Sequence, residues 1–495
     1  MNNSINEKIT SATKWSAVTE VAARLVAPIT SVVLAHILAP EAFGVVTTIV
    51  MIVTFAEIFT DAGFQKYLIQ HEFVDDADKW LSVNVAFWSN FAVSIAIWLV
   101  ICVFCDKLAE LVGNPGLGYV VAIACVSIPL EAFSSIQMAL YKRDFDFKTL
   151  FKVRMVGILI PLVVTIPLAL IFKNFWALVI GNITRDVFNA ILLTYFSQWK
   201  PRLVFSFARL KRMFSFTMWS MIEAISIWLT SYVDVFIVGT LLSQYYLGLY
   251  KTSSAVVGQI LGLITATATP VLFSALSRLQ NNESEFRSLY FKFQKTISII
   301  IMPLGVGIFC FRDFITYILL GSEWTEAAYL IGLWGLTSAF MIVLAHFCSE
   351  VYRAKGRPKL SVFAQFLHII FLWPTVLISV KYGYEVLCLS RSLVRFQGIL
   401  VNLLIMYYLV KISPFKMIRN IIPSLFASSV MLLLYYALPE TKDILTNILY
   451  IVLCSAAYII VLSLFKEDRK LLFEIKNTLG IDSFMKHKKI ESRNP

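Results

Sequence analysis

The chain has 495 residues, of which 58% are hydrophobic and only 15% are charged, and its mean hydropathy is +0.76. Apolar runs of about eighteen residues or more recur along its whole length, and a helix of that length crosses the hydrocarbon core of a bilayer. This composition excludes an ordinary soluble protein and predicts an all-α polytopic membrane protein. The runs are continuous rather than alternating, which argues against membrane-spanning strands.

The net charge of +12 is a topology signal. The basic connectors Lys142–Lys148, Lys200–Arg212 and Arg353–Lys359 alternate with LAPEA, GTLLSQ and GSEWTEAA, which carry no Lys or Arg. The positive-inside rule therefore places the basic connectors and both termini in the cytoplasm. No continuous basic face is visible, so no nucleic-acid partner is expected. The five histidines lack metal-ligand spacing and no P-loop is present, so neither a metal nor another cofactor is expected.

Fourteen membrane helices are predicted, and the last two precede a charged tail. They cover residues 15–37, 43–60, 80–104, 117–139, 150–172, 175–196, 213–240, 246–273, 293–311, 328–350, 360–380, 386–410, 418–438 and 444–465. We predict four parts: an amino-terminal six-helix lobe (1–204), a second six-helix lobe (205–410), an extra helix pair (411–465) and a cytoplasmic tail (466–495).

An internal repeat supports the two lobes. The stretch from Ser11 to Thr48 aligns without gaps with Ser215 to Thr252, 204 positions later. The identical pairs are Ser11/Ser215, Thr13/Thr217, Trp15/Trp219, Ser16/Ser220, Leu38/Leu242, Gly44/Gly248 and Thr48/Thr252. Further along, at a shift of 211, Lys148 aligns with Lys359. The copies begin an even number of helices apart, which predicts two parallel bundles with a central cleft, related by an axis along the membrane normal.

Several stretches carry a family resemblance. They are TKWSAVTE, LAPEAFGVV, FTDAGFQKYLIQ, KPRLVFSF, DVFIVGTLLSQYYLGLY, PVLFSALSRLQ, GSEWTEAA and YRAKGRP. With the helix count and loop lengths, they make residues 8–410 similar to the polysaccharide transporter, or Wzx-type lipid-linked oligosaccharide flippase, family of the multidrug/oligosaccharidyl-lipid/polysaccharide superfamily.

The resemblance implies a transporter rather than an enzyme. It would move an undecaprenyl-pyrophosphate-linked oligosaccharide from the cytoplasmic to the periplasmic leaflet of the bacterial inner membrane by alternating access, for capsule, exopolysaccharide or O-antigen assembly. Its partners would be membrane lipid and the polymerase and export machinery. The alternative on this architecture is a cation-coupled multidrug antiporter, in which Glu20 and Glu57 would supply the carboxylates. A membrane glycosyltransferase or polymerase is disfavoured because the connectors are short.

Ionisable residues inside membrane helices each cost about 2.5 to 3.5 kcal/mol to insert, so they are candidates for a polar path. Arg391 and Arg395 are four residues apart and should project from one face of their helix. They would form a diphosphate clamp, because the guanidinium fork suits phosphate oxygens. Alternatively, the helix sits shallower and the pair belongs to an interfacial layer.

The other candidate cations are Arg24, Arg154, Arg185 and Lys251, which would either bind the anionic head group in the cleft or pair with structural partners. Arg24 lies one turn after Glu20, an ordinary self-neutralising arrangement. Arg185 is adjacent to Asp186, and because neighbouring helix residues point in different directions we expect no good pairing between them.

The remaining candidate carboxylates are Glu57, Glu223 and Asp234, which would pair with cations or carry a coupling ion. Glu223 and Asp234 are eleven residues apart and should share one helix face, where Lys251 or Arg395 could pair with them. In the repeat, Arg24 aligns with Trp228 and Thr30 with Asp234, so a basic first hairpin should face an acidic second one.

Tryptophans near predicted helix ends are expected to form an interfacial belt. These are Trp80, Trp176, Trp199, Trp219 and Trp324.

Overall fold

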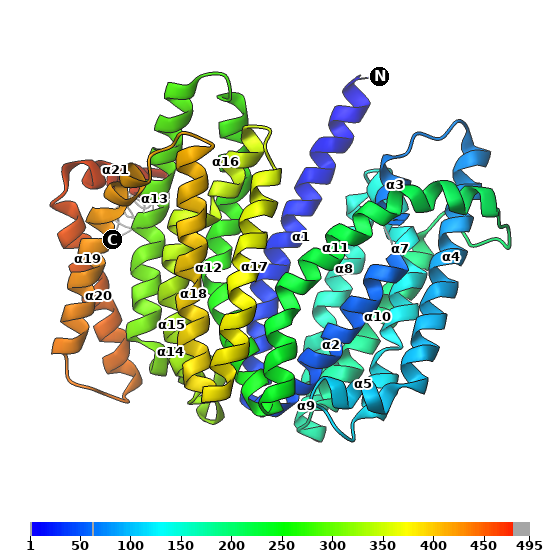
Figure 1. The fold of residues 1–495 in the computed structure, drawn as a ribbon, viewed down its shortest axis with the longest axis horizontal. Helices are drawn as coiled ribbons and strands as arrows, with labels where there is room; N and C mark the ends of the chain where they lie inside the picture. Colours follow the sequence, from blue (N-terminus) through cyan, green and yellow to red (C-terminus); the bar gives the residue numbers. More distant parts are fainter. Residues whose placement is uncertain (1, 62–63, 479–495) are drawn as a thin grey trace, which may run out of the picture. The chain divides into compact units, whose positions relative to one another are not determined.

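The computed structural model describes residues 2–61 and 64–478, and these consist of helices and connecting loops only (Figure 1). Within these described residues, fourteen helical segments are long and apolar enough to cross a membrane, which confirms the predicted number. The chain is therefore an all-α, multi-pass membrane protein. Packing divides it into two compact units, and each is described by itself.

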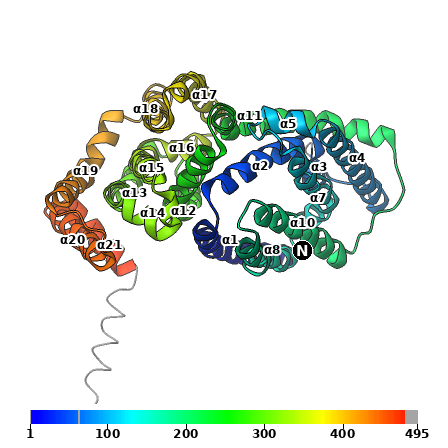
Figure 2. The same cartoon turned by 90° about the horizontal axis from the view of Figure 1, so that it is seen from below.

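The amino-terminal unit runs to Thr252 and also includes the short segments Leu319–Trp324 and Val380–Tyr384. Its helices are α1 (Asn2–Ile37), α2 (Pro40–Asp61), α3 (Phe64–Gln70), α4 (Asp76–Val103), α5 (Cys105–Leu111), α6 (Gly118–Ala124), α7 (Ser127–Arg143), α8 (Phe147–Ile160), η1 (Pro161–Thr165), α9 (Ile166–Phe172), α10 (Trp176–Phe196), α11 (Phe207–Leu241), η2 (Ser322–Trp324), η4 (Val380–Tyr382) and the start of α12 (Gln244–Arg278). Figure 2 looks along many of these helices and shows α1, α8 and α10 side by side.

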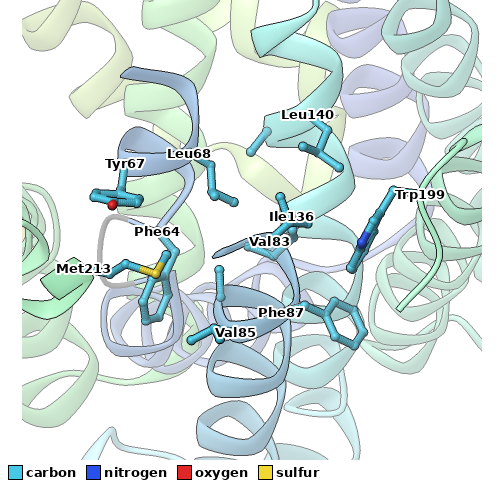
Figure 3. Close-up of a cluster of buried hydrophobic side chains, with 12 residues drawn as sticks. Phe64, Tyr67, Leu68, Val83, Val85, Phe87, Ile136, Leu140, Trp199 and Met213 are labelled. Carbon is cyan, nitrogen blue, oxygen red and sulfur yellow. The ribbon is translucent and has the colours of Figure 1, made fainter. Parts of the chain in front are cut away.

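A buried apolar cluster joins α3, α4 and α7 (Figure 3). The short helix α3 was not predicted, because its seven residues cannot span a membrane, and it buries Phe64, Tyr67 and Leu68 on one face. Trp199 packs into the same cluster beside Phe87, with ring centroids 5.5 Å apart. Its side chain is only 6% exposed, so its assignment to the interfacial belt was wrong.

The two copies of the repeated hairpin meet at a glycine crossing between α2 and α12. A Cβ atom added to Gly44 would lie 2.0 Å from the carbonyl oxygen of Gln244. One added to Gly248 would lie 1.9 Å from the carbonyl oxygen of Pro40. Gly44 aligns with Gly248 and Pro40 aligns with Gln244 at the shift of 204. The two contacts are therefore reciprocal, as in a repeat with local two-fold symmetry. Glycine is required here because the two backbones touch.

Close contacts also hold the ends of α1 and α11. The indole Nε1 of Trp324 donates to the carbonyl oxygen of Ala35 at 2.9 Å. Near the end of α11, a Cβ added to Gly113 would lie 1.8 Å from the carbonyl oxygen of Gly239. Trp324 is fully buried. Its side chain packs against α1 instead of lying at a lipid interface, so its assignment to the interfacial belt was also wrong. The side chain of Trp219 falls outside the described residues.

The carboxy-terminal unit contains the rest of α12 and the later helices. These are α13 (Glu283–Cys310), α14 (Arg312–Leu320), α15 (Ala327–Met341), η3 (Ile342–His346), α16 (Cys348–Ala354), α17 (Lys359–Ser379), α18 (Tyr384–Tyr408), α19 (Pro414–Ala437), α20 (Ile444–Ser463) and α21 (Lys466–Thr478). Helix α13 lies at the centre of this unit, packed between α15 and α19, and α19 pairs with α20.

The start of the predicted charged tail is a helix docked on this unit. Lys295 of α13 is buried, and its Nζ lies 2.7 Å from Glu467 and 3.2 Å from Asp468 of α21. The Lys295 ammonium lowers the pKa of Glu467. Burial raises the pKa of Asp468, although the same ammonium opposes that effect. The tail is thus anchored by an ion pair, which the sequence pattern did not reveal.

Candidate functional site

In the carboxy-terminal unit, Arg391 and Arg395 of α18 share one aromatic platform. The guanidinium carbons lie 4.9 Å and 3.5 Å, respectively, from the ring centroid of Trp334 on α15. Arg395 Nη1 also donates to Ser338 Oγ. Two arginines over one ring must project from the same helix face, and Arg395 lies near the middle of α18. A guanidinium stacked on an indole keeps its N–H edge oriented for an anion.

In the amino-terminal unit, one carboxylate bridges two arginines between α1 and α8. Glu20 lies 2.8 Å from Arg24 and 3.7 Å from Arg154. The Glu20–Arg24 pair is thus formed, and Arg154 joins it. All three side chains are partly exposed, and the group has an excess of one positive charge. It can attract an anion, but its carboxylate is engaged by two cations.

A second charged group joins α2, α7 and α10. Arg185 Nη2 lies 3.0 Å from Asp186 and 3.9 Å from Glu131. The expectation that Arg185 and Asp186 pair poorly was wrong, because the long arginine side chain folds back to reach its neighbour. Asp186 is almost fully buried. Glu57 and Glu131 line the same cavity as Asp186, so carboxylates outnumber the arginine here.

The third group lies where α11 meets the start of α12. Tyr250 donates its hydroxyl to the Asp234 carboxylate at 2.7 Å, and both side chains are buried. The Lys251 ammonium lies 5.3 Å from the ring centroid of Tyr232. The side chain of Glu223 falls outside the described residues, so its expected alignment with Asp234 stays a prediction.

The structure thus groups the predicted residues into three sites in one unit and one site in the other. Sequence reasoning missed the residues that orient these charges, namely Trp334, Ser338, Tyr250 and Tyr232. It also missed the neutral polar lining of the cavity, including Asn90 and Asn189. Amide side chains within apolar runs were the available signal, since they too are costly in a membrane.

The fold and these intramembrane charged groups define a multi-pass protein with polar sites between its helices. The chain belongs to the polysaccharide biosynthesis protein family, whose sequence profile matches residues 33–329. This match confirms the family indicated by the sequence resemblance.

Similar proteins include an uncharacterized membrane protein in the cps region of Klebsiella pneumoniae, 24% identical over 76% of this chain and 77% of its own length. The succinoglycan biosynthesis transport protein ExoT of Rhizobium meliloti (strain 1021) is 24% identical over 69% of this chain and 68% of its own. The lipopolysaccharide biosynthesis protein WzxC of Escherichia coli (strain K12) is 21% identical over 65% of each chain.

Among solved structures, the lipid II flippase MurJ in an inward closed conformation aligns with a TM-score of 0.71 and 15% identity. The alignment covers 91% of this chain and 98% of that one. An inward-facing multidrug resistance MATE family transporter of the MOP superfamily aligns with a TM-score of 0.56 and 12% identity, over 80% of this chain and 94% of its own. These likenesses show that the chain shares the fold of these two proteins.

Proposed function

We propose that the chain is a flippase that moves an undecaprenyl-pyrophosphate-linked oligosaccharide from the cytoplasmic to the periplasmic leaflet of a bacterial inner membrane. It would supply capsule, exopolysaccharide or O-antigen assembly, with both termini in the cytoplasm. The observation that carries the proposal is the pair Arg391 and Arg395, oriented by Trp334 near the middle of a membrane helix. A pyrophosphate has oxygens enough to engage two guanidinium groups at once.

The energetics of such a transporter require no nucleotide. A pyrophosphate with about two negative charges moves outward down a cytoplasm-negative potential, which favours it by about 4.6 kcal/mol per 100 mV. The barrier is the burial of a charged head group in hydrocarbon, and intramembrane arginines lower that barrier. The chain would then act as a transporter that needs no bound nucleotide.

The antiporter alternative needs Glu20 and Glu57, and the geometry argues against Glu20 alone, because Glu57 lines a cavity together with Glu131 and Asp186. Glu20 lies between Arg24 and Arg154, so it is not available to an organic cation. Export of a cationic dye that is lost in Glu20→Gln would revive that alternative.

The test is deletion of the gene, followed by leaflet-resolved analysis of undecaprenyl-linked intermediates. Completed units should accumulate on the cytoplasmic side and be restored to the outer leaflet by the wild-type gene. The double variant Arg391→Gln, Arg395→Gln should fail to restore them. Arg419→Gln, an exposed arginine of α19, controls for the loss of basic charge. Normal outward exposure in the deletion strain would reject the proposal.

A further inference from the structure

Helix α21 divides its side chains between two opposite faces. One face is turned to the carboxy-terminal unit, where Asp468 is buried and Leu471 and Leu472 pack against a buried apolar cluster. The opposite face carries exposed residues at positions i, i+3, i+4 and i+7, the spacing of neighbours on one side of a helix. These residues are Lys466, Arg469, Lys470 and Phe473. The outward face of α21, defined by these four residues, therefore presents three cations and one aromatic ring.

The carboxylates of α21 are engaged elsewhere. Glu467 and Glu474 are seven residues apart, so they share one flank of the helix over about 10 Å. Lys295 of α13 lies 2.7 Å from Glu467, and Lys292 lies 3.0 Å from Glu474. In the described part of the chain, the ion pairs of α21 involve its carboxylates and none of the three outward cations. No ion pair there compensates the positive charge of the outward face.

The position of α21 keeps this face at the bilayer surface. Helix α20, which is long and apolar enough to cross a membrane, ends at Ser463, and only two residues separate it from Lys466. Such a link spans about 10 Å at most, which is close to the depth of the head-group layer. The two ion pairs to α13 hold α21 against the unit along two of its turns. Figure 1 shows α21 beside the start of α19, at one end of this helix pair.

Apolar side chains accompany the cations. Leu464, directly after α20, is 76% exposed, and Phe473 on the outward face is 59% exposed. An exposed aromatic ring beside lysine and arginine is typical of a helix that lies in the membrane interface, where the ring enters the acyl boundary and the cations attract anionic head groups. A membrane surface therefore suits the outward face better than water does.

We propose that the outward face of α21 is a binding site for the head groups of anionic phospholipids. The three cations form charge-assisted hydrogen bonds with phosphate oxygens, and Phe473 packs among the upper acyl carbons. The ligand is a resident membrane lipid, because the charge pattern of the connectors predicts that α21 lies at the cytoplasmic surface, which is anionic. Binding fixes the depth of α19 and α20 in the bilayer, and it does not depend on the nature of the cargo.

The test measures lipid binding to the purified full-length protein by native mass spectrometry. The probes are phosphatidylglycerol and phosphatidylcholine with identical acyl chains, so that they differ in head-group charge. The wild type should bind phosphatidylglycerol at least tenfold more tightly, since each Lys or Arg near an anionic surface strengthens binding about fivefold. The triple variant Lys466→Gln, Arg469→Gln, Lys470→Gln should lose at least tenfold of this preference and retain its affinity for phosphatidylcholine.

The controls separate the site from net charge and from folding. The triple variant Lys148→Gln, Lys211→Gln, Lys359→Gln removes the same charge at exposed positions of the basic connectors and should keep the preference. Lys466→Arg combined with Lys470→Arg should also keep it, because the charge is conserved. Phe473→Ser should weaken both lipids equally, since the ring contacts acyl chains. Each variant is compared with the wild type at equal melting temperature.

Three results would overturn the proposal. The first is a wild type that binds the two lipids equally. The second is an equal preference for phosphatidylglycerol in the two triple variants, because the preference would then arise outside α21. The third is tighter binding of undecaprenyl pyrophosphate than of phosphatidylglycerol that is lost in the α21 triple variant, which would assign the outward face to a transported lipid instead of a resident one.

Discussion

The glycine crossing gives the sharpest test of the fold. In Gly248→Ala, the new Cβ would start 1.9 Å from the carbonyl oxygen of Pro40, whereas an ordinary contact is 3.4 Å or more. The helices must separate by roughly 1.5 Å, and such overpacking costs about 1 to 3 kcal/mol. Gly258 lies on the same helix, and a Cβ atom added there would have nothing within 4 Å. Gly258→Ala should therefore stabilise the helix by up to about 1 kcal/mol.

The assay is thermal inactivation of the purified protein, followed by size exclusion of the surviving fraction. Gly44→Ala should resemble Gly248→Ala, since its Cβ meets the Gln244 carbonyl oxygen. The double variant should cost less than the sum of the two, because one separation of the helices relieves both clashes. If Gly44→Ala and Gly248→Ala were as mild as Gly258→Ala, the close crossing would be refuted.

Three further predictions concern buried and charged groups. Trp324→Phe should lower the stability of the fold by about 1 to 3 kcal/mol, because it removes the indole that donates to the Ala35 carbonyl oxygen of α1 and leaves a void. Thermal inactivation measures the loss, and an unchanged stability would contradict the role of this buried contact. Lys295→Met should make α21 sensitive to limited proteolysis, because it leaves a carboxylate buried without its cation. Lys292→Met, which removes an exposed ion pair, should not. Equal protection of α21 in both variants would refute the role of Lys295 in holding this helix. Arg395→Lys should lower the outward exposure of the lipid-linked unit although the charge is kept, since lysine lacks the planar guanidinium fork. Arg419→Lys should leave that exposure unchanged. Full activity of Arg395→Lys would refute the diphosphate clamp.

The number and approximate ends of the membrane helices follow from the sequence, because hydrocarbon accepts only long apolar helices with internally paired backbones. The expected helix at 360–380, for example, is α17 at Lys359–Ser379. The repeat could also be recognised in the sequence, since Gly44 and Gly248 occupy equivalent positions in its two copies. Short helices such as α3 and α21 were not predicted, because length and hydropathy mark only segments that cross a membrane.

The intramembrane charges could be located in the sequence, but their partners could not. Helical spacing places Arg391 and Arg395 on one face, yet only packing brings Trp334 from another helix beneath both. Asp186 was expected to turn away from Arg185, and the tertiary structure shows the pair in contact because side-chain length outweighs backbone direction.

The sequence by itself determined that this is a fourteen-helix membrane protein of a polysaccharide family with costly charges in its helices. The tertiary structure decided which of these charges neutralise one another and which line a shared cavity. The physical reason is that hydropathy acts along one helix, whereas electrostatic pairing and cavity shape arise between helices that are distant in the chain.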